Sequence, residues 1–99
     1  MLNIQKSVQN TTARVSLEGR LDTVSAPELE QVLKEMLPGM TELTLDFAKL
    51  DYISSAGLRV LLSAQKVMNK QGQMKLTNVN ETIMEIFDVT GFVDLLTIL

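Results

Sequence analysis

The chain has 99 residues, of which 45% are hydrophobic and 4% aromatic, and it contains no cysteine and no histidine. Its length favours one domain, residues 1–99, around a single aliphatic core. The formal charge of −3 opposes the phosphates of nucleic acid and the anionic face of a membrane, so neither is an expected partner. Without histidine the chain lacks the usual general base and transition-metal ligand. We therefore expect no enzyme, no cofactor and no metal site.

The sequence has no long apolar run, so we expect neither a membrane span nor a signal peptide. The apolar pairs Phe92-Val93 and Leu95-Leu96 are separated by Asp94, and the N-terminal residues lack the apolar region of a signal peptide. The absence of cysteine fits a reducing compartment. We expect a cytoplasmic protein with no direct membrane insertion.

The first third of the chain predicts two strands and a helix. Apolar and polar residues alternate over residues 2–4 and 13–17, with a turn at residues 9–11 and Gly19 ending the pair. The segment Ser25-Ala26-Pro27-Glu28 matches a capping box, which satisfies free N–H groups in a first helical turn. From Leu29, apolar residues recur at i, i+3, i+4, i+7 and i+8, and Pro38-Gly39 ends this helix.

The rest of the chain alternates strands with helices. Residues 43–47 predict a short third strand, with Leu50, Tyr52 and Ile53 packing beyond it. A mostly buried helix runs from Ser55 to the glycine at position 72, residues 74–76 indicate a fourth strand, and a third helix follows Asn80. Residues 95–99 suggest a last short strand. The central helix shows water a narrow polar stripe: Arg59, Ser63, Lys66 and Lys70.

This order of elements predicts the fold class. A helix between two consecutive strands of one sheet requires those strands to be parallel. We therefore expect an α/β (α+β) fold with a mixed sheet of four to five strands and three helices packed on it.

Two adjacent serines, Ser54 and Ser55, stand where a strand ends and a helix begins. Free N–H groups and the positive end of the helix dipole meet there, so a phosphate on a serine would be stabilised. The commoner role of a serine at this place is to cap the helix. A nucleotide-binding loop is a weaker alternative, because neither G-x-x-x-x-G-K-[ST] nor G-x-G-x-x-G occurs.

The residues around these serines resemble a known family. The run Leu45-Asp46-Phe47 through Tyr52-Ile53-Ser54-Ser55-Ala56-Gly57-Leu58-Arg59-Val60-Leu61-Leu62 resembles the signature of STAS domains, in particular of bacterial anti-sigma factor antagonists. Two other segments resemble the family in order and spacing: Gly19-Arg20-Leu21-Asp22 with Ala26 and Leu29, and Ile86-Phe87 with Thr90-Gly91-Phe92. The similarity covers nearly all of the chain and implies a STAS-like fold.

The resemblance also implies a phosphorylation switch. In the family, an anti-sigma factor that is itself a serine kinase phosphorylates the serine that maps onto Ser55, with Ser54 as the less favoured acceptor. Many members carry aspartate at the position of Ser54 and serine or threonine at that of Ala56. The unmodified form binds the anti-sigma factor and frees the sigma factor, the phosphorylated form releases it, and a phosphatase resets the switch. The partner surface that this implies comprises Asp22, Thr23, Ser54, Ser55, Ala56, Gly57 and Arg59.

Other interpretations remain open. STAS-like domains also serve as accessory subunits of membrane transport complexes, where the serine would only cap the helix. A hydrolase using Ser55 is disfavoured because no histidine can activate it. By its chemistry alone, Asp22 fits a turn-forming loop residue as well as it fits a residue of the partner surface. The carboxylates of Asp46, Asp51, Glu81 and Glu85 have no spacing that requires a metal. The sequence does not set the oligomeric state, and a monomer is the simplest expectation.

Overall fold

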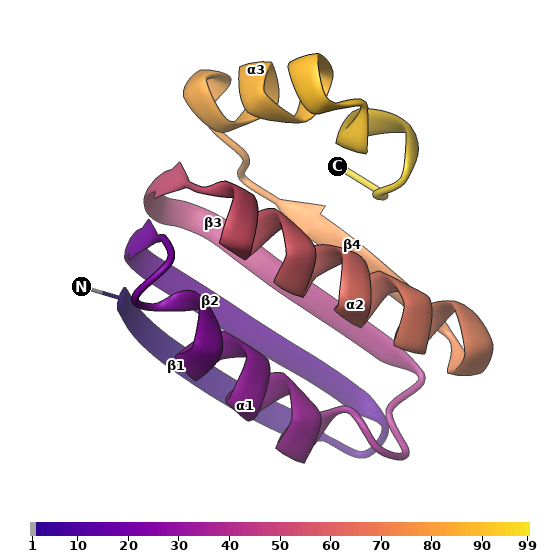
Figure 1. Ribbon diagram of the computed structural model, residues 1–99. Coiled ribbons are helices and arrows are strands. Elements are labelled where there is room, and N and C mark those ends of the chain that lie inside the picture. Colours follow the sequence, from indigo (N-terminus) through magenta and orange to yellow (C-terminus); the bar gives the residue numbers. More distant parts are fainter. Residues whose placement is uncertain (1) are drawn as a thin grey trace.

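The computed structural model describes residues 2–99 and contains a four-stranded sheet with helices packed against one face (Figure 1). The sheet order is β1-β2-β3-β4, formed by Leu2–Gln9, Thr12–Leu21, Glu42–Ile53 and Gln73–Thr77. β1 pairs antiparallel with β2, whereas β2, β3 and β4 run parallel. The helices are α1 (Ala26–Met36), α2 (Ser55–Gln71) and α3 (Glu81–Thr90), followed by the 3₁₀ turn η1 (Phe92–Asp94). The predicted fold class is confirmed.

Alternation along β2 separates a buried face of the sheet from an open one. Ala13, Val15 and Leu17 are buried against the helices, while Arg14 between them is exposed. On the open face the guanidinium of Arg14 lies 3.0 Å from the carboxylate of Asp46 on β3. The helix layer and the core therefore occupy one side of the sheet only.

β3 is longer than the sequence suggested. The prediction ended this strand near residue 47, but it continues to Ile53. Two register shifts against β2 add extra residues to β3, between Ser16 and Glu18 and between Gly19 and Arg20 of β2. Such bulges turn the next side chains back toward the core, so Leu50 and Ile53 are buried although strict alternation is broken.

α1 and α2 lie side by side across the sheet, and α3 lies on the β4 side (Figure 1). The expected end of α2 and the expected start of α3 are confirmed. α2 stops at Gly72, where a Cβ atom would overlap the carbonyl oxygen of Thr41. The Asn80 side chain accepts a hydrogen bond from the N–H of Ile83 at 2.9 Å, which caps α3.

The expected last strand over residues 95–99 is wrong. The chain forms η1 and then a single parallel bridge between Leu76 and Ile98. Leu76 N–H donates to Thr97 at 2.9 Å and Leu99 N–H donates back to Leu76 at 2.9 Å. Because η1 uses residues 92–94 to reverse the chain, too few residues run beside β4 to form a ladder.

Candidate functional site at the start of α2

The C-terminal ends of β2 and β3 bring two helix starts to the same edge of the sheet. α1 follows β2 and α2 follows β3, and both begin at this edge (Figure 1). The N–H of Ser54 donates to the carbonyl oxygen of Leu21 at 2.8 Å. This bond places the loop of residues 22–25 beside the first turn of α2.

Ser54 and Ser55 differ in what their hydroxyl groups do. Ser54 is the N-cap of α2, is half-buried, and its Oγ accepts a hydrogen bond from the N–H of Gly57 at 3.4 Å. Ser55 is the first residue of the helix and is exposed, and its hydroxyl makes no hydrogen bond to any residue in 2–99. The structure therefore leaves Ser55 accessible and gives Ser54 a capping role.

The first turn of α2 has the electrostatics of an anion site. The N–H groups of Ser55 and Ala56 have no backbone acceptor among the described residues, as expected for the free end of a helix. The first turn carries no acidic residue, whereas α1 has Glu28 and α3 has Glu81 in the same place. Negative charge added at Ser55 therefore meets free donors and the positive end of the dipole.

Gly57 sets how closely α2 approaches the sheet. A Cβ atom at this position would lie 2.7 Å from Leu21 Cγ and 2.8 Å from Ile53 Cγ1, closer than side-chain atoms pack. Gly57 is itself buried. Its role in this geometry is to let the first turn rest on the ends of β2 and β3, which holds Ser55 in place.

Asp22 organises the neighbouring loop. Its Oδ1 accepts hydrogen bonds from the N–H of Ser25 at 3.0 Å and from the N–H of Val24 at 3.1 Å. The hydrogen bond from the Ser25 backbone is the largest of several that hold the pKa of Asp22 below its usual range. The carboxylate thus fixes the loop beside α2 in one conformation.

The predicted capping box at Ser25 is wrong. Ser25 has helix-like dihedral angles, φ −92° and ψ −19°, and its side chain makes no cap hydrogen bond. Its buried hydroxyl instead donates to the carbonyl oxygen of Arg20 at 2.8 Å and accepts from the N–H of Asp22 at 2.9 Å. A cap serine normally needs extended dihedral angles to reach the third helical N–H, and the short Asp22 loop removes that option.

The remaining predicted site residues lie around this edge. Thr23 and Arg59 are exposed, and Ala56 is half-buried. The sequence interpretation missed two further residues here: the guanidinium of Arg20 stacks 4.6 Å above the ring centre of Tyr52 and lies 4.0 Å from Asp22 Oδ2. The only signal for them was their position in the segments that carry the family resemblance.

Two other classes of site receive no support from the described residues. Within residues 2–99 no group of three or more acidic, histidine or cysteine side chains is arranged to hold a metal ion. Over the same residues no helix is both long and apolar enough to cross a membrane.

The family is decided by the match to a family model described as "Mlab, STAS domain", which covers residues 4–97. The chain belongs to the STAS domain family. Its relatives include the anti-sigma-B factor antagonist of Bacillus subtilis, 30% identical over 98 residues that cover 98% of this chain and 90% of that protein. The anti-sigma-B factor antagonist of Staphylococcus epidermidis is 32% identical over 97 residues, which cover 96% of this chain and 90% of that one.

Several solved structures share the fold. An anti-sigma factor antagonist from Mycobacterium paratuberculosis matches with a TM-score of 0.89 at 19% identity, covering 99% of this chain and 85% of that chain. SpoIIAA in its unphosphorylated form matches with a TM-score of 0.77 at 18% identity, covering 98% and 87%. The phosphorylated form of Bacillus SpoIIAA matches with a TM-score of 0.76 at 19% identity, covering 98% and 91%.

Proposed function

We propose that this STAS domain is an anti-sigma factor antagonist whose hold on its partner is released by phosphorylation of Ser55. The observation that carries the proposal is the exposed, unbonded hydroxyl of Ser55 on the first turn of α2, next to a half-buried Ser54 that caps the helix. Relatives 30–32% identical over nearly the whole chain are named anti-sigma-B factor antagonists, which supports the same role here.

The unmodified surface suits a protein partner. Asp22, Thr23 and Arg59 present charged and polar groups around Ser55, and the bonds that Asp22 makes keep the loop in place before binding. A preorganised loop lowers the ordering cost of association. The binding partner in this proposal is an anti-sigma factor that is also a serine kinase, and this chain supplies only the hydroxyl that accepts the phosphoryl group. A separate phosphatase removes the phosphate.

Phosphorylation changes this surface without unfolding the domain. A phosphate adds about −1.5 to −2 charges and three acceptor oxygens at a helix start with free N–H groups. SpoIIAA is a relevant parallel, since its two forms match this chain with TM-scores of 0.77 and 0.76. Phosphorylation destabilises the complex and not the fold, because a partner whose surface is complementary to a neutral serine loses electrostatic complementarity. We expect a loss of affinity on the order of a thousandfold.

The test is a calorimetric titration of the chain with its cognate anti-sigma factor. Ser55→Asp should weaken binding by about a hundredfold or more, since one carboxylate mimics only part of the phosphate charge, while Ser55→Ala retains it. Ser7→Asp is the matched control, because Ser7 is an exposed serine on β1 and should bind like the unmodified chain. Unchanged affinity of Ser55→Asp, or binding to a transporter ATPase instead of a kinase, would contradict the proposal.

A further inference from the structure

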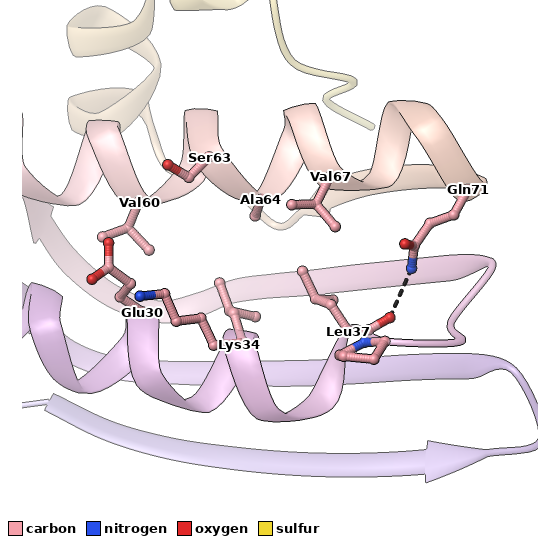
Figure 2. A pocket seen from close by; sticks show the side chains of 10 residues that line it. Glu30, Lys34, Leu37, Val60, Ser63, Ala64, Val67 and Gln71 are labelled. Carbon is pink, nitrogen blue, oxygen red and sulfur yellow. Dashed lines mark hydrogen bonds between the residues drawn. The ribbon is translucent and has the colours of Figure 1, made fainter.

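A groove runs between α1 and α2, away from the Ser55 site (Figure 2). Its volume is about 430 Å³. Four of the side chains that line it, Leu33, Leu37, Val60 and Ala64, are only 3–6% exposed and form the floor, whereas Val67 at the lip is 42% exposed. A pocket of this size with an apolar floor is the usual form of a site that takes apolar groups of a ligand or partner.

The walls of the groove are fixed in the free protein. The side-chain Nε2 of Gln71, at the end of α2, donates to the carbonyl oxygens of Leu37 at 2.7 Å and Met40 at 2.6 Å. Figure 2 shows the first of these bonds crossing from one helix to the other at one end of the groove. The two helices are thereby tied at their C-terminal ends, so the groove exists before anything binds.

The α2 side of the groove is basic although the chain as a whole is acidic, whereas the α1 side carries one residue of each sign, Glu30 and Lys34. α2 carries Arg59, Lys66 and Lys70 and no acidic residue, in a chain of formal charge −3. All three are exposed, on the stripe of α2 next to Ser63 and Val67 of the groove. At 1.5 Å per residue, the stripe from Arg59 to Lys70 extends for about 16 Å. It therefore presents positive charge along the α2 side of the groove.

This spread of charge decides which occupant fits. A fatty acid or similar amphiphile has one anionic head and would need cations gathered at one end of the groove. An amphipathic helix offers apolar side chains at i, i+4 and i+7 together with acidic side chains repeated along one flank. Of these two occupants, only the helix has apolar side chains for the floor together with acidic side chains that run parallel to the row of cations on α2.

We propose that the groove between α1 and α2 binds an acidic amphipathic helix of a protein partner. The apolar side chains of that helix enter between Leu33 and Val60 and contact Val67, and its carboxylates face Lys66 and Lys70. The groove begins at Val60, five residues beyond Ser55, so a protein that covers the start of α2 can reach it. The groove does not include Ser55, and helix binding needs neither the kinase nor the phosphate.

The test uses a fluorescein-labelled synthetic peptide of about 18 residues, with leucines at i, i+4, i+7 and i+11 and glutamates along one flank, to face Lys66 and Lys70. Fluorescence anisotropy should show it binding at least about tenfold more tightly than a peptide in which lysine replaces every glutamate. A version with a central proline should bind weakly, since it cannot form the helix. Oleate serves as the single-headed competitor and should not displace the acidic peptide.

Two variants test the location. Val67→Asp should reduce peptide affinity by about tenfold or more, because it places a charge at the apolar lip, and Lys66→Glu with Lys70→Glu should reduce it by about fivefold to tenfold. The matched controls are Val89→Asp on α3, 88% exposed, and Lys49→Glu on β3, both of which should bind normally. Circular dichroism verifies that each variant is folded.

Three results would overturn the groove proposal: equal binding of acidic and basic peptides, normal binding by Val67→Asp, or displacement by oleate. Each of these leaves the Ser55 switch standing, because the peptide experiment contains no kinase. Conversely, a failed titration with the anti-sigma factor leaves peptide binding to the groove unaffected. The two proposals therefore fail separately.

Discussion

The starts of α1 and α2 occupy equivalent places in the fold and use their serines differently. Each helix follows a parallel strand at the same sheet edge, and each has a serine at its N-cap, Ser25 or Ser54. At α1 the serine is 6% exposed and its hydroxyl bonds to Arg20 and Asp22. At α2 the cap bond is long, at 3.4 Å, and the next residue, Ser55, is exposed.

The difference lies in the third residue of each helix and in the loop before it. α1 has the exposed Glu28 there and a loop held by Asp22, whereas α2 has the buried Gly57 and no preceding loop of its own. The glycine brings the first turn of α2 down onto the sheet, and the turn then presents Ser55 outward. The N-cap serine of each helix thus has a hydrogen-bonding role, and α2 also has a second serine, Ser55, which is exposed one residue later.

The largest expected effect is at Gly57. Gly57→Ala should lower the free energy of unfolding by about 1–3 kcal/mol, because the added methyl group meets Leu21 and Ile53. Urea denaturation monitored by circular dichroism measures this change. Ser63→Ala, at an exposed position of the same helix, is the control and should stay within about 0.5 kcal/mol of the unmodified chain. Equal stability of the two variants would contradict the packing role of Gly57.

A serine-to-alanine series measures the contrast between the two helix starts directly. Ser25→Ala should cost about 1–2 kcal/mol, because buried groups lose their hydrogen-bond partner. Ser54→Ala should cost about 0.5–1 kcal/mol for a long cap bond, and Ser55→Ala should change stability by less than about 0.5 kcal/mol. The same denaturation assay applies. If Ser55→Ala proved as costly as Ser25→Ala, the hydroxyl of Ser55 would be structural.

A smaller effect is expected from pH, acting through the loop at α1. The pKa of Asp22 is lowered in the folded chain, chiefly by the hydrogen bond from the Ser25 backbone. A depressed folded pKa contributes stability above the unfolded pKa, near about 3.9, and that contribution is lost as the pH falls through the lower folded value. The stability difference between the unmodified chain and Asp22→Asn should therefore be largest near neutral pH and shrink below about pH 4.

Asp46 also contributes to the pH dependence of stability, so its contribution must be separated from that of Asp22. Its pKa is also lowered, mainly by the hydrogen bond from the Asn78 side chain, so the unmodified chain loses stability in acid for two reasons. Comparing Asp22→Asn with Asp46→Asn by denaturation at several pH values separates them. A difference for Asp22→Asn that stays constant from pH 7 down to about pH 2 would mean that the carboxylate charge does not hold the loop.

The sequence predicts most of the fold because its signals are local. The apolar stripe from Leu29, the stop at Pro38 and the cap at Asn80 each depend on residues within one or two turns. In the structure Leu29 lies within α1, α1 ends at Met36 just before Pro38, and α3 begins after Asn80. The length of β3 and the fate of residues 95–99 depend on pairing with distant strands. The bulges against β2 set the length of β3, and the turn at η1 leaves residues 95–99 with a single bridge to β4. Neither feature produces a periodic pattern in the sequence.

The sequence predicts which residues form the site better than it predicts what each of them does. The segment with Ser54, Ser55 and Gly57 was identified from its residues and its family resemblance. The predicted role of Ser25 is wrong, because the capping-box pattern does not reveal that the carboxylate of Asp22 accepts the hydrogen bond from the Ser25 N–H. The stacking of Arg20 on Tyr52 joins strands that are far apart in sequence, so no spacing rule indicates it.

The most direct test of the central claim is to locate the phosphate. The chain is incubated with its cognate anti-sigma factor kinase and ATP, and fragment-ion mass spectrometry assigns the modified residue within the peptide that contains both Ser54 and Ser55. We predict phosphate on Ser55 in the unmodified chain and in Ser54→Ala, and none in Ser55→Ala. Phosphate on Ser54, or an equal rate of modification in Ser55→Ala, would contradict the account.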